Sequence, residues 1–253
     1  LLMEKPLAIS TISLASGFHL PNPSPPLPPS MPMPPSSPPV PRPDIPQACY
    51  QSNSTLTFNQ LTPSPRVVGG RPTTPREHPY YALVTDGNYG SKLNNYCGGT
   101  LIDSSWVLTA AHCCDGITRV ALGLTDLNSV NDACVEEISV TGELKYPGWS
   151  MDSWWDKDIC LLRLEYPSIY PSISFYASTE YLDAFVGSNP VILTGLGRTS
   201  YDDFTYPSEV RTAKLTYFPR QNCSEAYDGS FGEVINNMGC AGGSGTPTDS
   251  LNA

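Results

Sequence analysis

The chain after residue 66 is built from short apolar runs that alternate with turn-forming residues. The runs are rich in Val, Ile, Leu and aromatic residues and are separated by Gly, Pro, Asn and Asp; they cover 67–70, 80–84, 99–102, 106–111, 119–124, 159–164 and 191–197. Many short runs bounded by turn residues are typical of strands in a β-sandwich or barrel. No stretch shows sustained helical periodicity or an internal repeat. We therefore predict an all-β domain.

Residues 1–66 have a different composition from this domain. Segment 21–46 contains 14 prolines in 26 residues. Proline lacks the backbone N–H and has a fixed φ, so we predict a disordered, extended linker, with a ligand for proline-recognition domains as the alternative. Residues 1–20 fit either a weak signal peptide, with its apolar stretch at Leu7–Ala15, or an unstructured leader.

Charge and cysteine content narrow the function classes. The net charge is −10, with only 14 Lys and Arg residues. This argues against nucleic-acid binding, which needs clustered basic residues to neutralise phosphates. No apolar run approaches the ~20 residues that cross a bilayer, so we expect no membrane span. Eight cysteines are typical of a secreted, disulfide-stapled protein, which predicts an extracellular location.

A histidine and an aspartate stand out against the apolar runs. His112 lies in the segment Thr109–Cys113, directly after an apolar run, and Asp158 opens the run that continues to Leu164. A general-base histidine needs one ring nitrogen toward the nucleophile and the other toward a carboxylate, and a carboxylate that enters a buried strand needs a partner. A zinc site at His112, Cys97, Cys113 and Cys114 is the competing chemistry, but adjacent cysteines are poor ligand spacing.

Five motifs in order resemble those of the trypsin-like (chymotrypsin-fold) serine endopeptidases. They are RVVGG at 66–70, CGGTLI at 97–102, WVLTAAHC at 106–113, DICLLRL at 158–164 and TGLGRT at 194–199. The resemblance covers residues 66–253 and implies two packed antiparallel β-barrels with an active site between them. It implies His112 as the general base and Asp158 as the carboxylate that orients it. Protein or peptide substrates and protease inhibitors are the implied partners, with no cofactor and no metal.

The same resemblance implies that the protein is made as a zymogen. Cleavage after Arg66 would free the ammonium of Val67, which in the family pairs with a buried aspartate and assembles the substrate pocket. Residues 47–66 are then a propeptide-like segment, and residues 67–253 are the protease domain. An ordinary junction between linker and strand is the alternative for this motif.

The cysteines fit the family in part. By resemblance, Cys97 pairs with Cys113 and Cys223 pairs with Cys240. We expect a bridge between Cys114 and Cys134, although nothing in the sequence requires it. Cys160 lies inside an apolar run and is interpreted as a buried free thiol. Cys49 lies upstream of the cleavage motif, where some family members tether their propeptide, and it has no evident partner. The sequence therefore does not determine how Cys49, Cys114, Cys134 and Cys160 pair.

The last residues match the family up to its specificity pocket. The spacing from Cys240 places Asp249 where trypsins keep the acid that binds a substrate Arg or Lys, although a solvated loop aspartate is the alternative. Beyond Ser250 the pattern fails, because Leu251 stands in place of a cysteine and Ala253 in place of the oxyanion-hole glycine. The nucleophilic serine motif is not among the printed residues. We therefore expect the second barrel to be incomplete and the chain to be inactive as written.

Three hypotheses remain for the whole molecule. The preferred one is a C-terminally truncated form of a serine endopeptidase that cleaves after Arg or Lys. The others are a catalytically dead homologue acting as a secreted regulatory protein, and a secreted adhesion or binding module on the same scaffold.

Overall fold

The computed structural model describes residues 44–50, 70–87, 96–151, 156–173, 190–197, 206–218 and 240–242. Every regular element within these ranges is a strand or a single 3-10 turn. None of the described helical turns has the length and apolarity that a bilayer crossing requires. The predicted all-β class is confirmed.

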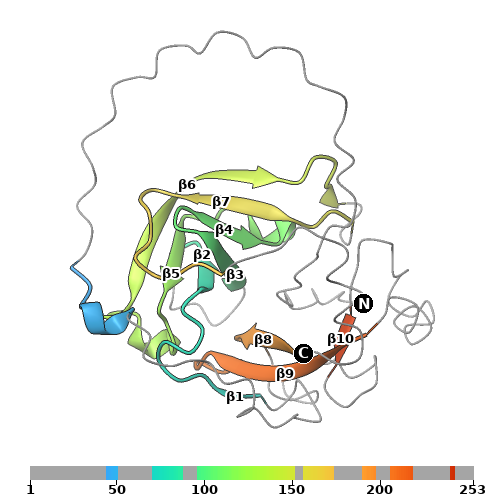
Figure 1. The fold of residues 1–253 in the computed structure, drawn as a ribbon. Helices are drawn as coiled ribbons and strands as arrows, with labels where there is room; N and C mark the ends of the chain where they lie inside the picture. Colours follow the sequence, from blue (N-terminus) through green and yellow to red (C-terminus); the bar gives the residue numbers. More distant parts are fainter. Residues whose placement is uncertain are drawn as a thin grey trace, which may run out of the picture.

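Six antiparallel strands close into a barrel, in the order β2-β3-β4-β7-β6-β5 (Figure 1). The strands are β2 (Tyr81–Thr85), β3 (Tyr96–Asp103), β4 (Trp106–Thr109), β5 (Arg119–Leu122), β6 (Glu136–Lys145) and β7 (Cys160–Leu164). Closure pairs each strand on both sides, so the barrel leaves no open edge. The barrel contains five of the predicted apolar runs, and β6 is a strand that the apolar pattern did not indicate.

A second sheet lies beside the barrel in Figure 1, built around the long strand β9 (Arg211–Phe218). All of its other strands pair with β9 antiparallel: β1 (Arg71–Pro72), β8 (Pro190–Gly195) and β10 (Cys240–Gly242). The described residues thus form one closed barrel and one open four-stranded sheet. This is the two-part architecture that the sequence resemblance implied.

Within the described residues, single turns of 3-10 helix connect or flank the strands. They are η1 (Gln47–Cys49), η3 (Ala111–Cys113) and η4 (Leu127–Ser129). The turn η3 directly follows β4, and its backbone bonds run from the N–H of Cys113 to the carbonyl of Ala110 and from Cys114 to Ala111. A turn of this length is marginal by itself and depends on its surroundings.

The barrel interior is the main hydrophobic core. Every residue of β2 is buried, which fits its continuous apolar run, whereas β4 and β7 bury mainly alternate residues. Gly99 of the CGG motif is required by packing, since a Cβ there would lie 2.8 Å from Cγ1 of Val107 and 2.9 Å from Cγ2 of Val84. The motif glycine therefore allows β3 to approach its neighbours across the core.

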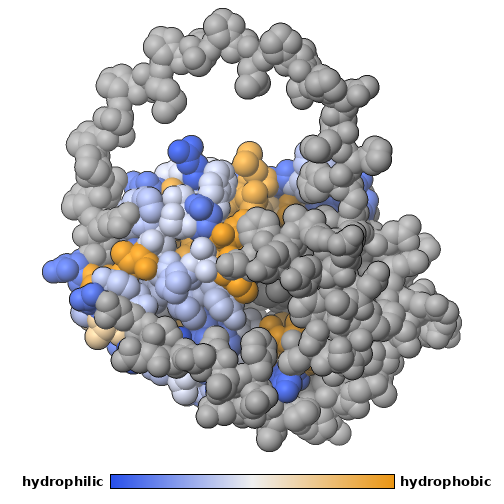
Figure 2. Space-filling view, viewed as in Figure 1, coloured by the Kyte–Doolittle hydropathy of each residue, from blue (hydrophilic) through white to orange (hydrophobic). Residues whose placement is uncertain are grey.

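The outer surface mixes hydrophilic and hydrophobic residues on the face shown in Figure 2. The large hydrophobic side chains exposed among the described residues are Leu144, Met151 and Tyr206. Leu144 lies in the outer half of β6, where the burial pattern no longer alternates regularly.

The segment before the cleavage motif packs on the barrel. Cys49 in η1 forms a disulfide with Cys134, and its side chain is buried. Arg76 donates a hydrogen bond from Nη1 to the carbonyl of Ala48 at 2.6 Å, and Tyr50 packs against the barrel core. Cys49 therefore has a partner that spacing did not indicate.

Candidate active site

The ladder between β4 and β7 brings two distant motifs together. Thr109, the last residue of β4, pairs with Cys160, the first residue of β7. His112 follows β4 by three positions, within η3, and Asp158 precedes β7 by two positions. Because antiparallel strands place the end of one beside the start of the other, the two side chains meet at the same end of the ladder.

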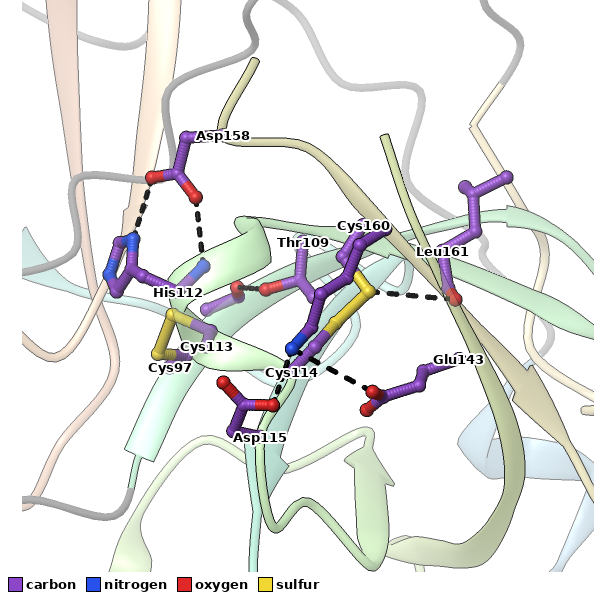
Figure 3. The surroundings of a disulfide bond; sticks show 12 residues. Cys97, Thr109, His112, Cys113, Cys114, Asp115, Glu143, Asp158, Cys160 and Leu161 are labelled. Atoms are coloured by element: carbon purple, nitrogen blue, oxygen red, sulfur yellow. Dashed lines mark hydrogen bonds and ion pairs between the residues drawn. A yellow bond between two sulfur atoms is a disulfide. The ribbon is translucent and has the colours of Figure 1, made fainter. Parts of the chain in front are cut away.

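Asp158 and His112 make two hydrogen bonds with each other (Figure 3). The backbone N–H of His112 donates to Oδ1 at 2.8 Å, and ring atom Nδ1 lies 2.6 Å from Oδ2. An ionised carboxylate can only accept, so Nδ1 carries the proton in this pair and Nε2 is left as the ring nitrogen that faces away from the carboxylate. The imidazole is therefore held in the tautomer that general-base chemistry requires.

Both side chains of the pair are partly exposed, at 27% for His112 and 20% for Asp158. Burial by itself would raise the pKa of the Asp158 carboxyl. The ring and backbone hydrogen bonds from His112, the charge of that ring and a backbone hydrogen bond from Ala111 outweigh burial and hold this pKa below its usual range. Asp158 is consequently ionised at neutral pH, as an acceptor that orients an imidazole must be.

Two disulfides meet at η3, one on each side of the turn (Figure 3). Cys113 is bonded to Cys97 of β3, the pairing that the family resemblance implied. Cys114 is bonded to Cys160 of β7. The expected bridge between Cys114 and Cys134 is therefore wrong, and so is the interpretation of Cys160 as a free thiol.

The physical reason for these two corrections is strand register. Cys160 is fully buried, which is what made it resemble an ordinary core residue, but the β4–β7 ladder places it beside the chain that leaves β4. Cys114 lies on that path, with its Cα 6.6 Å from the Cα of Cys160. Cys134 lies in the segment between β5 and β6 and is bonded to Cys49 instead. No cysteine among the described residues is a free thiol.

The alternative zinc site at His112, Cys97, Cys113 and Cys114 has no free thiolate ligands in this structure, because all three cysteines form disulfides. The ligand atoms of Cys97, His112 and Cys113 do lie within 4.8 Å of one another. Both of those sulfurs belong to one disulfide, and Cys114 belongs to another. Zinc is bound by the deprotonated thiol, which a disulfide does not supply.

Several predicted site residues lie outside the described part of the chain. They are Arg66 and Val67 at the cleavage motif, Asp249 at the specificity position, and Cys223. The backbone of Cys240 is described as the start of β10, but its side chain is not. These residues are therefore not among those that the structure brings together.

Lys157 is a site feature that sequence reasoning missed. It directly precedes Asp158 and has φ of 60°, in the left-handed region that non-glycine residues seldom adopt. The carbonyl of Lys157 accepts from the N–H of Ile159 at 2.7 Å, which closes the chain tightly around Asp158. Such conformations cluster at functional sites. A lysine carries no sequence signal for positive φ, so this could not have been found from the pattern.

Comparison with known proteins agrees with this geometry. Residues 67–251 match the family model described as Trypsin. The chain is 30% identical over 179 residues to Trypsin-3 of Salmo salar, covering 70% of this chain and 69% of that one. It is 33% identical over 204 residues to Melanization protease 1 of Drosophila melanogaster, covering 70% of this chain and half (50%) of that longer protein.

A solved structure has the same fold. Neuropsin, a serine protease expressed in the limbic system of mouse brain, aligns with a TM-score of 0.54 and 24% identity, over 68% of this chain and 73% of that chain. The match of 67–251 to the family model, with the identities above, extends over most of the printed chain. The chain belongs to the trypsin-like family of serine proteases.

Proposed function

We propose that this chain is the major part of a serine endopeptidase in which His112 is the general base and Asp158 its orienting carboxylate. The observation that carries the proposal is the pair of hydrogen bonds between these residues, 2.8 Å and 2.6 Å long, at one end of the β4–β7 ladder. In such an enzyme a serine hydroxyl attacks the peptide carbonyl. The imidazole accepts the hydroxyl proton and passes it to the leaving amine, and water then releases the acyl-enzyme.

The ionised carboxylate has two tasks in this scheme. It holds Nδ1–H in place, so that Nε2 can accept the proton, and its charge stabilises the imidazolium that forms during transfer. Asp158 remains ionised throughout, since the same hydrogen bonds that orient the ring keep the pKa of its carboxyl below the ordinary range, against the opposing effect of burial.

Specificity and activation belong to the proposal on the strength of the sequence alone. Asp249 stands at the family's pocket position and would bind the guanidinium or ammonium of a substrate Arg or Lys. Cleavage after Arg66 would create an N-terminus at Val67 and convert the zymogen to the active form. The three disulfides of the described residues support a secreted protein that acts on protein or peptide substrates.

The nucleophile is the part that the printed residues do not supply. No Gly-Asp-Ser-Gly-Gly sequence occurs in the 253 residues. Neither Ser244 nor Ser250 stands in that sequence, since Ser244 is followed by Gly-Thr and Ser250 by Leu-Asn. We therefore propose that peptide hydrolysis requires a serine presented in such a motif.

The test compares two forms of the protein with an arginyl amide substrate. One is the 253-residue chain, and the other is an extended chain in which the printed residues are followed by the C-terminal segment of a trypsin-like relative. After cleavage at Arg66 we expect hydrolysis by the extended chain only, and its loss in His112→Ala. An extended, correctly folded chain without activity would overturn the proposal.

An inactive relative with a binding role is the alternative function. Sequencing the transcript across the codon for Asp249 separates the two. A transcript that continues into the serine motif supports the endopeptidase. A protein of 253 residues isolated from tissue, bound to a partner and without peptidase activity, supports the inactive relative.

A further inference from the structure

The disulfide between Cys114 and Cys160 joins the two chain segments that carry His112 and Asp158. Cys114 follows His112 by two positions, and Cys160 follows Asp158 by two positions. The bond and the hydrogen-bonded pair therefore close a small ring of six residues: His112, Cys113, Cys114, Cys160, Ile159 and Asp158. In Figure 3 the Cys97–Cys113 disulfide lies beside the His112 ring, and the Cys114–Cys160 disulfide lies on the other side of the turn, where it joins the turn to β7.

The strand ladder ends before it reaches the pair. The last pairing between β4 and β7 is Thr109 with Cys160, so neither His112 nor Asp158 has a partner in that ladder. His112 is in a single 3-10 turn, and Asp158 lies next to Lys157, a residue with positive φ. Backbone of this kind has little stability of its own.

The hydrogen bonds of the pair are also open to competition from water, since both side chains are partly exposed. Hydrogen bonds that compete with water contribute only about 0.5–1.5 kcal/mol each to stability, which is little to hold two segments together. The disulfide, by contrast, is in the core: Cys114 and Cys160 are both fully buried. From within the hydrophobic core, it fixes the distance between the segments that carry His112 and Asp158, at the end of the β4–β7 ladder.

We propose that the Cys114–Cys160 disulfide is a positioning device for the His112–Asp158 pair, which it keeps in hydrogen-bonding register beyond the end of the strand ladder. That the pair is catalytic rests on the proposed function. That the disulfide holds the two side chains at hydrogen-bonding distance does not depend on activity. Cys114 and Cys160 touch no reacting group; they act through the two residues that they hold.

The experiment is proton NMR of the 253-residue chain, which has only three histidines, His19, His78 and His112. A short N–H···O bond to a carboxylate gives a proton resonance far downfield. In the wild-type chain we expect such a resonance from Nδ1 of His112, assigned by its absence in Asp158→Ala. In the double variant Cys114→Ala, Cys160→Ala we expect its exchange with water to rise by about tenfold or more, with broadening or loss of the signal.

The chain offers a matched control and an internal standard. The double variant Cys49→Ala, Cys134→Ala removes a disulfide away from the pair and should leave the His112 resonance unchanged. His78 reports on the fold in every sample, because its buried ring contacts the Thr212 hydroxyl at 3.0 Å. A His112 resonance that persists in the Cys114→Ala, Cys160→Ala variant, or that is absent from the wild type, overturns the proposal.

A second double variant tests the proposal if Cys114→Ala, Cys160→Ala does not fold. Cys114→Ala with Cys160→Val refills the space of the two sulfurs with apolar atoms and restores packing without the covalent link. If its His78 signals are native and the His112 resonance is still lost, the link itself positions the pair. If the resonance returns, packing is sufficient and the proposal is wrong.

Kinetics on the extended chain separate this inference from the proposed function. Loss of the disulfide should lower kcat by about 10²-fold with little change in KM, since misplacement of a catalytic group by about 1 Å has that effect. An extended chain with no activity at all, in which the resonance behaves as described, overturns the proposed function and leaves the positioning role intact.

Discussion

Asp158 binds His112 through both of its carboxylate oxygens, one to the backbone N–H and one to the ring. The hydrogen bond from the backbone N–H, 2.8 Å long, fixes the position of the His112 backbone. The hydrogen bond at Nδ1, 2.6 Å long, fixes the orientation of the imidazole ring. Replacing the carboxylate by an amide keeps the shape but removes the charge and offers an N–H to the ring, which favours the wrong tautomer.

We therefore expect Asp158→Asn to lower kcat of the extended chain by about 10⁴-fold with little change in fold. The matched control is Asp103→Asn, at the exposed end of β3, where the carboxylate only accepts from the N–H of Ser105. That variant should keep its activity. Equal activity of the two variants would contradict the assigned role of Asp158.

The surroundings of the Glu77 carboxyl predict how the free energy of unfolding depends on pH. It is nearly buried, and burial by itself would raise the pKa of its carboxyl. Hydrogen bonds from Arg71 and Thr74 and the charge of Arg71 prevail and lower that pKa to about 2. Because the folded pKa lies below the unfolded one, the stabilising contribution is complete above about pH 4.5 and is lost as the pH falls toward 2.

Urea unfolding at pH 7 and at pH 3 measures this contribution. Glu77→Gln should lower the free energy of unfolding at pH 7 by roughly 1–3 kcal/mol, and should flatten its decline in acid. Glu143→Gln, on the exposed outer half of β6, should behave like the wild type. An unchanged acid limb in Glu77→Gln would refute the assignment.

Lys157 makes a prediction through its positive φ of 60°. Glycine adopts that conformation without a steric penalty, whereas a β-branched residue does not. We expect Lys157→Gly to be as stable as the wild type or more stable by up to ~1 kcal/mol. Lys157→Val should lose about 1–2 kcal/mol and disturb the adjacent Asp158. Chemical denaturation of both variants measures this difference in the free energy of unfolding. Equal values for the two variants would mean that the positive φ at position 157 carries no steric strain.

Gly99 predicts a packing defect. Gly99→Ala would place a Cβ within 3 Å of the side chains of Val84 and Val107, in the core of the barrel. Overpacking of this kind costs about 1–3 kcal/mol. Gly195→Ala is the control, since a Cβ on that strand residue meets no atom within 4 Å. A thermal melt in which Gly99→Ala is no less stable than Gly195→Ala would contradict the packing described for β3.

The all-β class could be predicted because it depends on local sequence, and the two residues of the candidate site could be singled out for the same reason. The run at 80–84 is apolar throughout because β2 is buried throughout, and the run that ends at Leu164 became β7. His112 and Asp158 stood out because each lies at the end of an apolar run and carries a group that needs a partner. Their meeting followed from a family resemblance, and the structure has them 2.6 Å apart.

What could not be predicted depends on register and on backbone conformation. The strand β6 was missed because only its first part alternates between buried and less buried residues, while its outer half, which includes the exposed Leu144, does not alternate. The bond between Cys114 and Cys160 depends on Thr109 facing Cys160 across a ladder, and spacing along one chain does not contain that relation. The positive φ at Lys157 has no signature in its residue type.

The bridge from Cys49 to Cys134 has a consequence for the molecule after cleavage. Cys49 lies upstream of Arg66 and Cys134 lies within the barrel, so a cut at Arg66 would break the backbone without separating the two products. The mature protein would be a two-chain molecule, with the proline-rich arm in one-to-one ratio with the protease domain. Residues 21–46 would then stay covalently attached to the protease domain after the cut.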